Sequence, residues 1–137
     1  MNAAKSHVEA RNLMCQVMAN EKDIWFVENS SVLRFLLDRE LEMTKHAERG
    51  ISFGSVELAL EALECYYPSV IFLDLYMDGG KKDGWDFIRE SELIGYRGEI
   101  IIVSSTVNPE HKERAERLGV KMIKKPINAE TIESLIK

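Results

Sequence analysis

The sequence lacks the features that mark membrane, secreted and nucleic-acid-binding proteins. None of its apolar runs approaches the ~20 residues that a membrane span requires, and the N-terminus has no compact apolar stretch with a small-residue cleavage site. Basic residues are too few for a broad cationic surface, since 18 Lys and Arg face 23 Asp and Glu. We therefore expect a cytoplasmic protein whose partners are other proteins.

Cysteine is scarce as well. The two cysteines, Cys15 and Cys65, lie far apart and have neither metal-binding nor redox spacing. This usage suits a reducing compartment with inert thiols. The length of 137 residues allows one domain with a buried core and little else.

From Asp23 onward, short apolar runs alternate with helical patterns. The predicted strands are residues 24–27, 50–53, 70–73, 100–103 and 120–123. Three of them are continuously apolar, which is typical of parallel strands covered on both faces. The alternation predicts an α/β fold with a flavodoxin-like, doubly wound five-stranded parallel sheet of order 2-1-3-4-5 and helices on both faces.

The predicted helices have their own start and stop signals. Asn108 and Pro109 begin one helix, and Gly119 ends it. Apolar residues at helical spacing predict amphipathic packing helices at 33–41, 56–63, 85–94 and 129–136. Because the chain ends with the last of these, we expect a stand-alone domain without an output domain.

Residues 1–22 stand apart as a polar extension before a domain at residues 23–137. Ala10, Met14 and Val17 fall roughly along one helical face. Two alternatives remain open for this extension: a disordered segment, or a helix for docking or self-association.

Polar residues follow four of the predicted strands. They are Glu28 and Asn29 after the first strand, Asp74 after the third, Ser104 and Ser105 after the fourth, and Lys125 after the fifth. In doubly wound sheets, ligands bind outside the carboxyl ends of the strands. Neighbouring carboxylates favour a companion such as Mg²⁺, and hydroxyl and ammonium groups donate to phosphate oxygens. The sequence thus predicts a polar site at this edge.

The motifs Val-Ile-Phe-Leu-Asp74-Leu-Tyr-Met, Asp83-Gly84-Trp85, Ile-Ile-Val-Ser104-Ser and Lys125-Pro126 occur in this order. Together they resemble the receiver domain of two-component response regulators, of the stand-alone, chemotaxis-regulator type, over roughly residues 23–137. The resemblance implies that Asp74 accepts a phosphoryl group from a sensor histidine kinase or a histidine phosphotransfer protein. It also implies that the protein is a phosphoacceptor and not an enzyme, with at most self-phosphorylation from a donor and autodephosphorylation. Such a protein signals to a downstream target by altered protein-protein contacts.

The same resemblance implies further roles. Phosphate contacts fall to Ser104, Ser105 and Lys125, and Mg²⁺ contacts to Glu28, Asn29, Asp74 and the backbone carbonyl of Tyr76. In that family, a second acid after the first strand is a direct metal ligand, and Asn29 replaces it here. Since an amide oxygen carries no formal charge, we expect weakened Mg²⁺ affinity and slow phosphorylation.

Other positions also depart from the family pattern. The loop after Asp74 is longer and lacks the usual proline, so Asp78 or Asp83 either replaces the missing acid or is simply solvated. Met122 stands where many receivers carry a switching aromatic residue. His7, His46 and His111 occupy no motif position and are assigned no role.

A second hypothesis is a phosphorylation-independent (atypical) receiver that acts as a protein-interaction module, because Asn29 weakens the chemistry. The retained Asp74, Ser104 and Lys125 argue against complete loss. An enzyme or flavin-binding protein on the same architecture has no support from a Gly-rich turn after the first strand. The sequence does not decide between a monomer and a homodimer.

Overall fold

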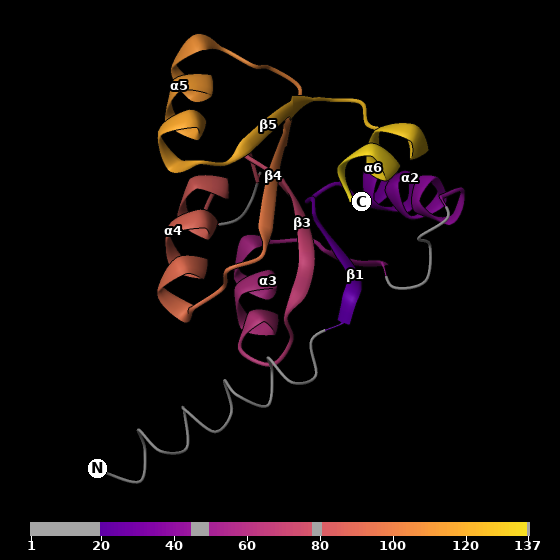
Figure 1. The fold of residues 1–137 in the computed structure, drawn as a ribbon, viewed down its shortest axis with the longest axis horizontal. Coiled ribbons are helices and arrows are strands. Elements are labelled where there is room, and N and C mark those ends of the chain that lie inside the picture. The colour runs from indigo at the N-terminus through magenta and orange to yellow at the C-terminus, as the bar shows by residue number, and fades with distance from the viewer. Residues whose placement is uncertain (1–19, 45–49, 78–80, 137) are drawn as a thin grey trace, which may run out of the picture.

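Five parallel strands form one sheet in the order β2-β1-β3-β4-β5 (Figure 1). The computed structural model describes residues 20–44, 50–77 and 81–136. The strands are β1 (Asn20–Val27), β2 (Gly50–Phe53), β3 (Pro68–Asp74), β4 (Glu99–Ser104) and β5 (Lys121–Lys124). The predicted strand order and the doubly wound topology are therefore confirmed.

Helices cover both faces of the sheet, with α3, α4 and α5 on one face and α2 and α6 on the other (Figure 1). Their bounds are α2 (Ser31–Glu42), α3 (Val56–Leu63), α4 (Gly84–Ile94), α5 (Pro109–Leu118) and α6 (Ala129–Leu135). Within the described residues, every helix is too short or too polar to cross a bilayer.

Side-chain caps explain where these helices begin. The caps are Ser30, Ser55, Asp83, Asn108 and Asn128, each of which accepts a hydrogen bond from the N–H three residues later. Helices α4 and α5 end at Gly95 and Gly119, whose φ values of 103° and 71° lie in the left-handed region that glycine tolerates. The helix predicted to begin after Asn108 and to end at Gly119 is thus confirmed, with Asn108 as its N-cap and Gly119 as its C-cap.

The side chains of each strand point alternately to the two faces of the sheet, and this divides the core into two apolar clusters. Trp25 and Ile71 face α3 and α4, where Phe87 is fully buried. Phe26 and Phe72 face the opposite layer, with Ile132 of α6. This division follows from the two-residue period of a strand, which sends successive side chains to opposite faces.

Helix α2 departs from the sequence prediction of a well-packed helix. Leu41 is its one buried residue, while Leu33 and Leu36 are 38% and 50% exposed. The leucine spacing correctly predicts a helix, but as a packing helix α2 buries only Leu41, and Leu33 and Leu36 stay outside the core. The physical reason is that α2 stands away from the sheet and leaves a cavity beneath it.

Strand β1 begins at Asn20, three residues before the predicted start of the domain. The extension predicted at residues 1–22 lies outside the described residues, apart from its last three positions. The boundary between an extension and a domain at residue 23 stays a prediction.

Candidate functional site

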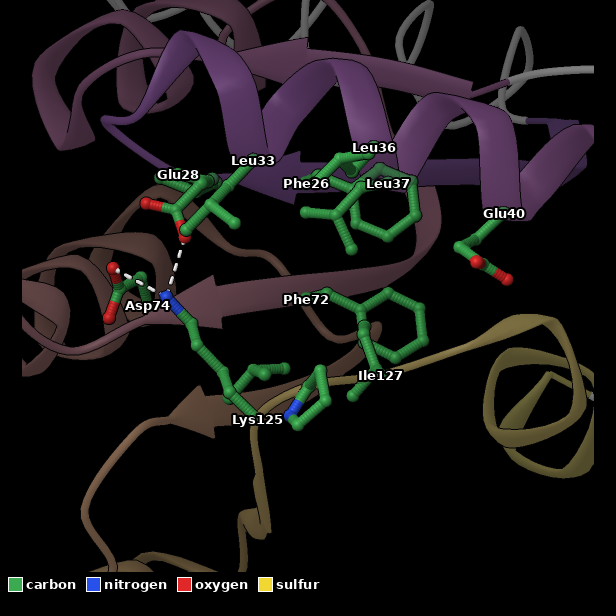
Figure 2. A pocket seen from close by; sticks show the side chains of 13 residues that line it. Phe26, Glu28, Leu33, Leu36, Leu37, Glu40, Phe72, Asp74, Lys125 and Ile127 are labelled. Carbon is green, nitrogen blue, oxygen red and sulfur yellow. Dashed lines mark hydrogen bonds and ion pairs between the residues drawn. The ribbon is translucent and has the colours of Figure 1, made fainter.

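Three charged side chains meet at the carboxyl edge of the sheet. The Lys125 Nζ donates to Glu28 Oε1 at 2.6 Å and to Asp74 Oδ2 at 3.2 Å (Figure 2). The Glu28, Asp74 and Lys125 side chains are 4%, 10% and 22% exposed. An ammonium group therefore bridges two nearly buried carboxylates.

The sheet itself positions these groups. Strands β1 and β3 are adjacent and parallel, with Val27 opposite Leu73, so the residues that follow them end side by side. The Lys125 N–H donates to the Ser104 carbonyl at 2.8 Å, which holds the chain after β5 beside the end of β4. Glu28 is fixed through its own backbone, whose N–H donates to the Phe53 carbonyl at 2.9 Å.

The titration behaviour follows from this geometry. Burial raises the pKa of Asp74, and the negative charge of Glu28 raises it further, against the opposing effect of Lys125. Burial alone would lower the pKa of Lys125, but its hydrogen bond to Glu28 and the charge of Asp74 leave that pKa above its ordinary value. Lys125 is thus the cation that compensates the two acids.

The other predicted site residues lie around these three. The Tyr76 N–H donates to Asp74 Oδ1 at 3.2 Å. Ser104 is fully buried, and its Oγ donates to the Thr106 carbonyl at 2.8 Å. Asn29 is half-buried next to Glu28, and Ser105 is exposed. Their proposed chemical roles stay predictions.

The site holds two carboxylates, which are ligands of the kind that a divalent cation takes, and both are engaged by protein donors. Each carboxylate oxygen of the site has a protein donor, because Ser30 N donates to Glu28 Oε2 at 3.3 Å and the other three oxygens are bound by Lys125 and Tyr76. Among the described residues, no group of three or more His, Cys, Asp or Glu side chains is placed to hold a metal. Two carboxylates with water and phosphate oxygens still suffice for Mg²⁺, which would compete with Lys125.

Asp83 caps the start of α4. Its Oδ1 accepts from the Asp86 N–H at 2.9 Å and its own N–H donates to Asp86 Oδ2 at 3.0 Å, a reciprocal cap of α4. This capping role favours the other alternative for Asp83, a solvated residue at the helix start, and a metal contact of Asp83 stays an untested prediction. Asp78, the other candidate, lies outside the described residues.

Gly84 explains why the Asp83-Gly84 motif belongs to the site. Its N–H donates to the Leu75 carbonyl at 3.0 Å, which brings the start of α4 against the end of β3. A Cβ at this position would lie 2.8 Å from the Asp74 carbonyl oxygen and 2.9 Å from Leu75 Cα. Glycine is required here by close backbone approach.

Sequence reasoning missed a contact between the loop after Asp74 and α5. The Tyr76 hydroxyl lies 3.3 Å from the ring nitrogens of His111, whose ring also meets the edge of Trp85. The Arg114 guanidinium lies over the Trp85 ring at 4.4 Å from its centroid. These residues come from three separate segments, so no local pattern could have revealed the cluster.

Comparisons with known proteins show the family and the fold of the chain. The sequence pattern of the response regulator receiver domain matches residues 24–137. No curated protein matches the chain. The chemotaxis protein CheY4 of Vibrio cholerae has a similar structure, with a TM-score of 0.70 and 19% identity over 82% of this chain and 92% of that chain.

Two further solved structures share the fold. The receiver domain of NtrX from Brucella abortus has a TM-score of 0.72 and 24% identity, over 82% of this chain and 93% of that chain. A two-component response regulator from Cytophaga hutchinsonii has a TM-score of 0.71 and 22% identity, over 82% and 92%. The family pattern spans every strand and helix described here except the first residues of β1. On that match, the chain belongs to the response regulator receiver domain family of two-component signalling.

Proposed function

We propose that Asp74 accepts a phosphoryl group from a phosphohistidine of a sensor histidine kinase or a histidine phosphotransfer protein. The observation that carries the proposal is the bridge from Lys125 to Asp74 and Glu28 at the carboxyl edge of the sheet. An Asp74 oxygen would attack phosphorus while the bond from phosphorus to the histidine nitrogen breaks, and the imidazole would take the leaving electron pair. An acyl phosphate on Asp74 results.

The role of Lys125 is electrostatic. Charge grows on the phosphoryl oxygens during transfer, and an ammonium already beside Asp74 can stabilise it without long movements. Deprotonated Asp74 is the nucleophile, so its raised pKa makes the reactive form less abundant at mildly acidic pH than for an exposed aspartate. Phosphorylation should therefore slow as the pH falls.

Receiver domains typically bind Mg²⁺ at the acidic phosphorylation site, where the ion offsets phosphoryl charge. In this chain the proposed ligands are Glu28, Asn29, Asp74 and the Tyr76 carbonyl. Asn29 supplies a neutral oxygen in place of a carboxylate, so we propose weakened affinity. Metal binding would also require Lys125 to give up part of its contact with the two acids.

Ser104 and Ser105 are the proposed phosphate contacts on the loop after β4. The Ser104 hydroxyl donates to the Thr106 carbonyl at 2.8 Å, so it must leave that partner to reach a phosphoryl oxygen. Its movement would shift the loop that leads into α5 and alter the contacts of α5, β5 and α6 with a downstream target. The same proposal includes a cytoplasmic location and no catalysis beyond self-phosphorylation from a donor and autodephosphorylation. It leaves homodimer formation open.

A second candidate function is the phosphorylation-independent interaction module. It is favoured by one observation: the four carboxylate oxygens of the site already have protein donors. In this case the contacts of Lys125 with Glu28 and Asp74 would only stabilise the carboxyl edge of the sheet. The fold and its partner-binding faces would be kept without chemistry.

Intact-mass measurement after incubation with acetyl phosphate and Mg²⁺ separates the two candidates. The first predicts an adduct of one phosphoryl group that Asp74→Asn abolishes. Asp38→Asn is the matched control, since Asp38 on α2 accepts a hydrogen bond from Ser52 and its amide would keep an acceptor. If neither acetyl phosphate nor a phosphorylated histidine donor gives the adduct, the interaction module is the better account.

A further inference from the structure

A cavity of about 220 Å³ lies between α2 and the sheet, beside the chain that leads into α6 (Figure 2). Its apolar walls include Phe26, Leu33, Leu36, Leu37, Phe72 and Ile127. Asp74, Glu28 and Lys125 lie at one end, and Glu40 lies at the other (Figure 2). The cavity is therefore an apolar slot with carboxylates at both ends.

Polar contacts hold α2 in the position that leaves this space. The Arg34 Nη1 donates to the Glu28 carbonyl at 2.6 Å, near the start of the helix. The Ala129 N–H donates to Glu40 Oε2 at 2.8 Å, near its end. Leu33, next to the first anchor, and Leu36, between the two anchors, line the slot and remain partly exposed to water. The walls are thus held apart by contacts that do not depend on filling the slot.

Size and lining decide what fits. An engineered cavity of about 150 Å³ with walls of similar composition binds benzene, so this slot has room for an aromatic ring with a short side chain. Its apolar walls favour a ligand with a hydrocarbon body, whose transfer from water is favourable. A purely polar molecule would gain little there.

Charge selects among ligands of that size. Three carboxylates and one ammonium line the slot, so it carries a net formal charge of −2. Lys125 is already bound to two of the carboxylates, whereas Glu40 accepts a hydrogen bond from the neutral N–H of Ala129, which brings no compensating formal charge. The slot should attract organic cations and repel organic anions.

We propose that this slot binds a small organic amine, with an aromatic or branched aliphatic body between α2 and the sheet and an ammonium group directed to Glu40. Such a ligand would contact α2 and the wall beside Asp74 together. It would give the domain a chemical input separate from phosphotransfer, and the proposal does not rest on phosphorylation of Asp74.

The test is a titration of the unphosphorylated full chain with 2-phenylethylamine, followed by methyl NMR. Neutral 2-phenylethanol and anionic phenylacetate are the matched probes of similar shape. The expected result is saturable binding that is strongest for the amine and weakest for phenylacetate, with shifts in the methyl signals of Leu36, Leu37 and Ile127. Equal affinity for all three probes, or no saturable binding, would overturn the proposal.

Two variants locate the site. Leu37→Phe should fill the slot and weaken amine binding by at least about tenfold, while Leu93→Phe, at an 80% exposed position on α4, should leave it unchanged. Glu40→Gln keeps an acceptor for Ala129 and should weaken amine binding about two- to fivefold without affecting 2-phenylethanol. If Leu37→Phe fails to fold, Leu36→Phe replaces it. Unchanged amine affinity in a folded slot-filling variant would contradict the assignment.

Discussion

Replacing Lys125 by Gln removes the cation that bridges Glu28 and Asp74 at 2.6 Å and 3.2 Å. Breaking a buried ion pair by removing one partner typically costs about 3–5 kcal/mol, because the other charge is left uncompensated. Lys125 is 22% exposed, so water offsets part of this loss, and we expect a decrease of about 2–3 kcal/mol in the free energy of unfolding. In a domain of this size, that corresponds to a fall of about 10 °C in Tm.

Urea unfolding at neutral pH measures this loss, with Lys124→Gln as the matched control. Lys124 is exposed at the end of β5, so its replacement should change the free energy of unfolding by less than about 0.5 kcal/mol. Adding Glu28→Gln to Lys125→Gln should recover more than half of the loss, because one uncompensated carboxylate disappears. Equal losses for Lys124→Gln and Lys125→Gln, or no recovery in the double variant, would refute the reasoning.

Three further predictions concern the same edge of the sheet. Asn29→Asp should raise both Mg²⁺ affinity, measured by calorimetry, and the rate of phosphorylation by acetyl phosphate; if both stay unchanged, the proposal that Asn29 weakens metal binding is wrong. Gly84→Ala should lower the free energy of unfolding by about 1–3 kcal/mol in urea, because a Cβ would meet backbone atoms of Asp74 and Leu75; wild-type stability would contradict the close approach. Asp74 has a raised folded-state pKa, so its contribution to stability is present below the ordinary carboxyl pKa and is lost as the pH rises through the folded-state value. Asp74→Asn should therefore become more stable relative to the wild type between about pH 4 and pH 8 in urea unfolding, and a constant difference would argue against the raised pKa.

The sequence predicted most of the fold because its signals are local. Continuous apolar runs predicted the central strands, and Asn108 with Pro109 predicted the start of α5 within one residue. The position of a helix above the sheet is not local. The spacing of Leu33 and Leu36 indicates which face of α2 turns inward, but the gap beneath depends on Arg34 and on the contact between Glu40 and α6.

The candidate site was predictable to the same extent and for the same reason. Parallel strands in adjacent positions must end together, so the sequence alone placed Glu28, Asp74 and Lys125 at one edge. Hydrogen-bond direction was not predictable: the Ser104 hydroxyl is bound to the Thr106 carbonyl. Likewise, His111 meets Tyr76 only because α5 packs over the loop after β3, a tertiary arrangement that leaves no sequence pattern.

Asn29 stands where the family has a second acid, and the loss of that negative charge affects the ion pairs that Lys125 forms at the edge of the sheet. With two carboxylates in place of three, one ammonium compensates half of the negative charge and can contact both acids together. A phosphoryl group on Asp74 would add negative charge beside Glu28, whose side chain is only 4% exposed. Lys125 would then have to divide its hydrogen bonds between the phosphoryl oxygens and Glu28, its closer partner at 2.6 Å. Glu28 would need a second cation or a proton, and this requirement makes Glu28 the acid on which Mg²⁺ dependence should rest in this chain.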